Sequence, residues 1–171
     1  MARYVAFLRS VSPMNAKMPD LKRSFERAGF RDVKTLLSSG NVVFTSQVKS
    51  VAEIERKAET AMTQQLGRTF YTIVRPIDAL RRLLEADPYA TFTFPAEAKR
   101  VVTFLREPRK PRRPLPVEMD GARIHALVGR EIFSSYLRGP RGPVFMTLLE
   151  KTFGSDITTR TWETVRRCAN A

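Results

Sequence analysis

The chain of 171 residues contains one cysteine, Cys168, and one histidine, His125. A single cysteine cannot form an intramolecular disulfide, which excludes the small secreted proteins that depend on disulfides. The two residues together are too few soft ligands for a structural zinc site. No apolar run approaches the roughly 18 residues that span a bilayer, and no small-residue cleavage site follows the first apolar stretch. These absences predict a soluble cytoplasmic protein with no membrane association.

Catalytic motifs are also absent. The sequence has no nucleophile elbow, no P-loop and no dinucleotide fingerprint, so it identifies no catalytic residue and no cofactor, and whether the protein is an enzyme stays open. His125 lies in an alternating apolar strand, where an outward polar side chain or a satisfied core group is favoured over a general base. Glu53, Glu55 and Glu59 are expected on the exposed side of their helix as solvated charges.

Acidic residues are scarce relative to basic ones. The chain has 30 Lys and Arg against 17 Asp and Glu, a net charge of +13. Residues 99–113 hold seven basic side chains and one acidic side chain, nearly half of the excess. Such a field attracts polyanions, with phosphate backbones as the first candidates. A GC-rich coding bias would also produce the excess of arginine without any function, so both interpretations remain open.

The first 75 residues predict six elements in the order β-α-β-β-α-β. Strands are expected at residues 4–8, 33–37, 41–45 and 69–74. One helix begins near Pro19, a second follows the capping box formed by Ser50 and Glu53, and each stops at a glycine. This order is the split-βαβ or ferredoxin-like arrangement.

Residues 76–171 predict a second unit of mixed helices and strands. Its expected elements are a helix at 78–86, a strand at 100–105, a hairpin of 122–128 and 131–135, a turn at 139–143, and helices at 144–153 and 159–168. In the last helix, Thr159 is expected as N-cap and Trp162 with Val165 on the buried face. The chain is therefore expected to be an α+β protein with subdomains at 1–75 and 76–171. The second half could be a degenerate repeat of the first, although no sequence repeat demonstrates it.

A proline-rich basic segment, residues 106–116, joins elements of the second half. Its prolines recur every third residue, the period of polyproline II, which predicts an extended and exposed connector. The basic residues expected to clamp a phosphate backbone, without sequence readout, are Arg109, Lys110, Arg112 and Arg113, helped by Arg138 and Arg141. The alternative is a solvated loop. No aromatic residue lies between Leu105 and Val117, which argues against base stacking.

A second candidate site is the loop between the first strand and the first helix. Arg9, Asn15 and Lys17 lie where a strand end meets a helix N-terminus, an arrangement that can hold an anion; an ordinary loop with a solvated lysine is the alternative. Asn41 could contact a ligand, but it also suits a hairpin turn. Arg160 could hold an anion, or it could bridge to a carboxylate of the first half in a structural role.

Two segments together carry a resemblance to a known family. They are Ser39-Gly40-Asn41-Val42-Val43-Phe44 and Thr158-Thr159-Arg160-Thr161-Trp162-x-Thr164-Val165, supported by Tyr4-Val5-Ala6-Phe7-Leu8-Arg9. The chain resembles, along its whole length, an uncharacterised and mostly bacterial family called domain of unknown function 1697. The resemblance implies an α+β protein of ferredoxin-like topology and brings no established activity.

The chain also departs from the pattern of that family. After the first strand the family typically has a glycine-bearing Gly-Ile-Asn-Val-Gly-Gly loop, where this chain has Ser10-Val11-Ser12-Pro13-Met14-Asn15. Glycines would let backbone N–H groups approach a phosphate, and their replacement weakens that role here. Thr161 stands where the family usually has asparagine.

Three functional hypotheses follow. The leading one is a non-catalytic binder of polyanions such as nucleic acid, because of the charge at 99–113. The alternative is an enzyme or sensor for a small phosphorylated ligand that uses Arg9, Asn15, Lys17 and Arg160. A protein-interaction module would instead present a contiguous exposed apolar patch.

Overall fold

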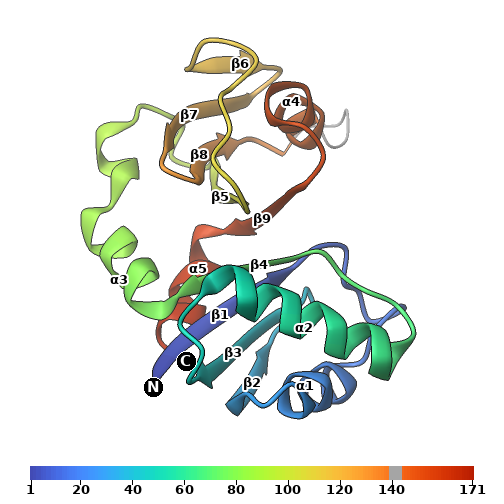
Figure 1. The fold of residues 1–171 in the computed structure, drawn as a ribbon. Coiled ribbons are helices and arrows are strands. Elements are labelled where there is room, and N and C mark those ends of the chain that lie inside the picture. The colour runs from blue at the N-terminus through green and yellow to red at the C-terminus, as the bar shows by residue number, and fades with distance from the viewer. Residues whose placement is uncertain (139–143) are drawn as a thin grey trace. The chain divides into compact units, whose positions relative to one another are not determined.

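The computed structural model describes residues 1–138 and 144–171 (Figure 1). The turn predicted at 139–143 lies outside the described residues, as does Arg141. The chain forms two compact units, Met1–Arg82 with Arg166–Ala171, and Leu83–Val165. Within the described residues, no helix combines the length and the apolar composition that crossing a bilayer requires.

The first unit contains a four-stranded antiparallel sheet and two helices that precede its last strand. Its elements are β1 (Ala2–Leu8), α1 (Met18–Arg27), β2 (Arg31–Leu36), β3 (Asn41–Ser46), α2 (Val51–Leu66) and β4 (Thr72–Pro76). The sheet order is β2-β3-β1-β4, with every neighbouring pair antiparallel. The predicted α+β class and the β-α-β-β-α-β order of this half are confirmed.

Local sequence signals explain both helices of the first unit. Pro19 lies in the first turn of α1, where its missing N–H costs nothing. The Oγ of Ser50 accepts a hydrogen bond from the N–H of Glu53, and α2 ends at Gly67 in the left-handed conformation. Phe25 of α1 packs with Phe44 of β3, their ring centroids 5.4 Å apart, in the core between the helices and the sheet.

The carboxylates of Glu55 and Glu59 correct one prediction. Both were expected as solvated charges, but Glu55 is buried, and its Oε2 accepts from the N–H of Val74 at 2.9 Å. Oε2 of Glu59 accepts from the N–H of Thr72 at 3.0 Å. β4 is an edge strand, so the N–H groups on its open side have no partner strand. The two carboxylates accept hydrogen bonds from two of these N–H groups, which would otherwise be available to solvent or to another chain.

The second unit contains a five-stranded antiparallel sheet of order β6-β7-β8-β5-β9. Helix α3 (Ile77–Ala86) leads into this unit, and the last helix, α5 (Trp162–Ala169), leads out of it. The remaining elements are a short 3-10 turn at Pro88–Thr91, β5 (Lys99–Leu105), β6 (Val117–Met119), β7 (Ala122–Val128), β8 (Glu131–Tyr136), α4 (Val144–Phe153) and β9 (Ile157–Thr161). The predicted hairpin is β7 and β8, and the helix predicted at 144–153 is α4.

The last predicted helix was placed too early, and two strands, β9 and β6, were missed. Residues expected to begin that helix form β9, because the branched run Ile157 to Thr161 suits an extended strand better than a helix. The N-cap is Thr161 rather than Thr159, since Oγ1 of Thr161 accepts from the N–H of Thr164 at 3.2 Å. The other missed strand, β6, is three residues long.

The second sheet repeats the topology of the first. Strands β5, β7, β8 and β9 take the places of β1, β2, β3 and β4, and α4 connects β8 to β9 as α2 connects β3 to β4. One hydrogen bond fixes the equivalence: the N–H of Leu8 donates to the carbonyl of Gly40, and that of Leu105 donates to the carbonyl of Arg130, each at 2.9 Å. In chain order, residues 106–119 stand where the first unit has α1.

Candidate anion-binding sites

The basic connector, residues 106–116, packs against the C-terminal end of α4. Arg109 forms a bidentate ion pair with Asp156, with both N–O distances 2.5 Å, and it also donates to the carbonyl of Phe153. The backbone N–H of Arg112 donates to the carbonyl of Thr152 at 2.9 Å. Donors from the connector therefore satisfy the free carbonyls at the negative end of this helix. Arg109 has a structural role that the sequence did not reveal.

Three neighbouring cations of the connector remain exposed, although the guanidinium of Arg112 lies close to Gly154, just after α4. Lys110, Arg112 and Arg113 are exposed, and within residues 1–138 and 144–171 none of them forms an ion pair. We call these three residues the connector strip. Lys151 of α4 is also exposed and adjoins Thr152, whose carbonyl holds Arg112. The strip therefore presents positive charge from a segment whose backbone is fixed on a helix.

The remaining two predicted phosphate contacts do not join this strip in the described structure. Arg138 is exposed and follows β8, whose last residue, Tyr136, pairs with Lys99 at the start of β5. The connector leaves the opposite end of β5, after Leu105. Arg138 thus follows the other end of these strands, and Arg141 lies outside the described residues.

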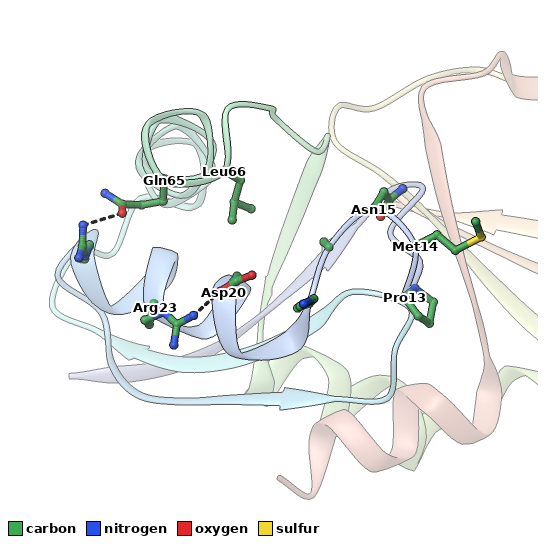
Figure 2. Close-up of a pocket in the computed structure, with 10 residues that line it drawn as sticks. Pro13, Met14, Asn15, Asp20, Arg23, Gln65 and Leu66 are labelled. Carbon is green, nitrogen blue, oxygen red and sulfur yellow. Dashed lines mark hydrogen bonds and ion pairs between the residues drawn. The ribbon is translucent and has the colours of Figure 1, made fainter.

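The loop at 9–17 forms one side of a pocket of about 440 Å³ in the first unit. Figure 2 shows Pro13, Met14 and Asn15 on one side of this pocket and the end of α2 on the other. Most of its charged side chains already have partners. Arg23 is paired with Asp20, and Arg27 donates to Oε1 of Gln65 at 2.6 Å (Figure 2).

Asn15 and Lys17 are the two predicted anion-binding residues that line this pocket. The Asn15 amide forms hydrogen bonds within the loop. Its Oδ1 accepts from the N–H of Ser12 at 2.9 Å, and its Nδ2 donates to the carbonyl of Ser10 at 2.8 Å. Lys17 is exposed and forms no ion pair within the described part of the chain. It is therefore the one of the two whose side chain can meet an anion.

Asn41 and Arg9 do not line the pocket. Asn41 is fully buried, and its Nδ2 donates to the carbonyl of Leu36 and to Oγ of Ser39, each at 3.0 Å. These bonds hold the β2–β3 turn. Gly40 in that turn has a φ of +84°, and a Cβ there would lie 2.9 Å from Cβ of Val11, so only glycine fits. The backbone N–H of Arg9 donates to the carbonyl of Tyr71 at 2.9 Å.

Arg160 occupies a position that recurs in both units. Arg160 lies on β9, opposite Val102 of β5. Its side chain is buried and donates through Nη1 to the carbonyl of Thr159 at 2.9 Å. Arg75 on β4 lies opposite Val5, is buried, and makes the same type of bond to the carbonyl of Val74 at 3.1 Å. Val5 precedes Leu8 by three residues, and Val102 precedes Leu105 by three residues. Because the N–H groups of these two leucines make the equivalent bonds described above, the two arginines are equivalent in the repeat.

The family of the chain follows from comparison with known proteins. The family described as "Protein of unknown function (DUF1697)" matches residues 1–133. The chain belongs to this family. The predicted resemblance is therefore confirmed over residues 1–133, whereas the segment at 158–165 lies outside the matched range.

Other comparisons support the fold of this DUF1697 protein. Its structure is similar to that of the conserved bacterial protein SP0830 from Streptococcus pneumoniae, with a TM-score of 0.69 and 17% sequence identity. The similarity covers 99% of this chain and 97% of that one, so it includes both units. No curated protein matches the chain.

Sequence reasoning missed two polar residues of this DUF1697 protein that form specific bonds in the fold, Arg75 and Asp156. Arg75 was overlooked, although it precedes the start of α3 by two residues as Arg160 precedes α5. Asp156 was overlooked because it lies 47 residues from its partner Arg109. The described residues contain no cluster of three or more histidine, cysteine or acidic side chains that could hold a metal ion.

Proposed function

We propose that this protein binds polyanions, with nucleic-acid phosphates as the ligand class, through the connector strip of Lys110, Arg112 and Arg113. The observation that carries the proposal is the outward exposure of all three cations on a backbone held to α4. A fixed backbone lowers the entropy that ordering would cost on binding. Lys151, which precedes Thr152 in α4, is a further exposed cation near this end of the helix.

Binding of this kind is independent of base sequence. Lysine and arginine contacts to phosphates position a protein on nucleic acid, whereas sequence is read from base edges. The connector contains no aromatic residue on which a base could stack. Affinity should therefore fall steeply with salt and differ little between sequences.

The test compares two triple variants with the same change in net charge. One is Lys110→Ala, Arg112→Ala and Arg113→Ala, and its control is Lys22→Ala, Arg56→Ala and Lys57→Ala, three exposed cations of the first unit. Arg109 stays intact in both variants because it holds α4. Binding to fluorescein-labelled duplex DNA and to single-stranded RNA is measured by fluorescence anisotropy over a series of salt concentrations.

The strip variant is expected to lose affinity and to reduce the slope of log K against log salt by up to about 3, close to one per phosphate contact. The control should keep most of the wild-type affinity. Equal losses in both variants would assign binding to overall charge rather than to the strip, and no binding by the wild type at low salt would refute the proposal.

The pocket beside Lys17 supports a second candidate function, the binding of a small phosphorylated ligand. Its volume of about 440 Å³ suits such a ligand, and Lys17 is exposed at its wall. Inorganic phosphate should then raise the melting temperature at moderate salt, and Lys17→Ala should abolish the shift. The same shift in the variant would rule out this pocket as the source.

A further inference from the structure

An aromatic cluster in the second unit surrounds the only histidine of the chain. The ring of Phe92 stacks on that of His125 with a centroid distance of 4.7 Å and an angle of 4°, and Phe94 approaches the same ring at 5.6 Å. The pairing of β7 with β8 shifts register between Ile124 and Ala126, at a β-bulge that includes His125. Bulges redirect side chains and occur frequently beside active sites.

His125 is hydrogen-bonded to a serine on the neighbouring strand. Its Nε2 lies 2.8 Å from Oγ of Ser135, which is within the distance that a general base needs to activate a nucleophile. Both side chains are largely buried, at 8% and 2% exposure. Among the described residues, no second group bonds to the histidine, so serine and histidine form a pair rather than a triad.

Ser135 also forms part of the wall of a pocket of about 260 Å³. Apolar side chains of Phe94, Met119 and Leu137 line the same pocket, together with Arg123. Glu118 and Asp120 line it as well, so the pocket offers both apolar and charged surface beside Ser135. A small acyl group suits the apolar part of this lining.

Arg123 lines this pocket and carries a hydrogen-bond donor that has no partner among the described residues. It lies directly opposite Ser135 in the strand register, so their side chains stand on one face of the sheet. Its Nη1 is paired with Glu118, but its Nε is buried and has no hydrogen-bond partner in the described structure. An orphaned N–H costs free energy unless a ligand accepts from it.

We propose that Ser135, His125 and Arg123 form an acyl-transfer site for small carboxylic esters. Oγ of Ser135 attacks the ester carbonyl and forms a new C–O bond, while its proton passes to Nε2 of His125. The Nε–H of Arg123 donates to the oxyanion that develops on the carbonyl oxygen. Collapse of the intermediate breaks the ester C–O bond, and the alcohol leaves with the proton from His125. Water then hydrolyses the acyl-serine by the same steps, with His125 as base.

The surroundings of His125 suit the role of base. Burial, reinforced by the positive charge of Arg123, lowers the pKa of His125 below its ordinary value, so the imidazole is neutral at pH 7. The attack requires the tautomer that carries its proton on Nδ1 and accepts at Nε2.

The experiment follows p-nitrophenyl acetate hydrolysis by the full chain and its covalent modification by diisopropyl fluorophosphate. In that modification Oγ bonds to phosphorus, fluoride leaves, and the proton passes to His125. The variants are Ser135→Ala and His125→Gln, with Ser134→Ala as the matched control, because Ser134 is equally buried and adjacent but does not line the pocket. Near-UV circular dichroism confirms that each variant is folded.

Wild type and Ser134→Ala are expected to release p-nitrophenolate faster than buffer and to gain one diisopropylphosphoryl group at Ser135. Ser135→Ala should lose both reactions, and His125→Gln should slow them about 100-fold, a typical contribution of a general base. Modification of another serine, a wild type no faster than buffer, or undiminished hydrolysis by a folded Ser135→Ala variant would overturn the proposal.

Discussion

The two units build the same four-strand order but cover their sheets differently. In the first unit, two helices pack on one face, and the segment after the first strand continues into α1. In the second, the corresponding segment is the basic connector, which packs with α4 through Leu115 and then adds β6 to the sheet. Both candidate anion sites, the loop at 9–17 and the connector, thus lie in the same connection of the repeat.

This difference has an energetic consequence. A helix satisfies its own backbone groups and can devote its side chains to the core, whereas an irregular segment needs specific donors and acceptors from its neighbours. Arg109 and the N–H of Arg112 supply such bonds in the connector. The neighbouring cations are left facing outward, which is where a phosphate could meet them.

The first prediction tests whether α1 and the connector differ in their contribution to the core. Phe25 is fully buried, so Phe25→Ala should lower the free energy of unfolding by about 3–5 kcal/mol. Leu115 is half-buried, and Leu115→Ala should cost about 1 kcal/mol. Urea titrations followed by far-UV circular dichroism measure both values. Similar costs would show that the connector replaces α1 as a core element.

The second prediction tests whether Arg109 stabilises the fold while its exposed neighbour, Lys110, does not. Arg109→Ala removes a bidentate pair and a bond to the end of α4, and should lower the free energy of unfolding by about 1 kcal/mol. Lys110→Ala is its matched control and should change stability by less than about 0.5 kcal/mol. Urea titrations at low and high salt give both numbers. Equal effects would contradict the assignment of separate roles to these adjacent residues.

Local signals in the sequence predicted most of the first unit. Caps, glycine stops and alternation of apolar residues act within a few positions, so the elements around Ser50 and Gly67 were placed close to their observed bounds. The same local reasoning failed for Glu55, since helix periodicity carries no information about an edge strand that needs an acceptor. It also failed at Thr159, where a capping residue and a branched strand residue look alike.

The repeat could be suspected but not established from the sequence, because equivalent positions hold different residues. Asn41 and Glu131 both begin the third strand of their units, and each folds its side chain back on the preceding turn. The amide of Asn41 donates to the carbonyl of Leu36, whereas the carboxylate of Glu131 accepts from the N–H of Arg130, so each turn is held by a different bond and no sequence identity is required. The candidate sites were harder to predict, because exposure of Lys110 and pairing of Arg109 depend on where Asp156 comes to lie.

The third prediction uses the absence of histidine from the first unit. Because the folded state lowers the pKa of His125, the unfolded chain binds a proton more readily than the folded one. Stability should therefore fall as the pH drops through about 6.5, the ordinary histidine pKa, and level off below the folded value. The effect is confined to one group and should be the smallest of the three.

Urea midpoints between about pH 7.5 and pH 5 measure this loss of stability, and His125→Gln should flatten this part of the profile. An unchanged slope in the variant would assign the acid sensitivity to carboxylates, which both units contain, rather than to the histidine that only the second unit has.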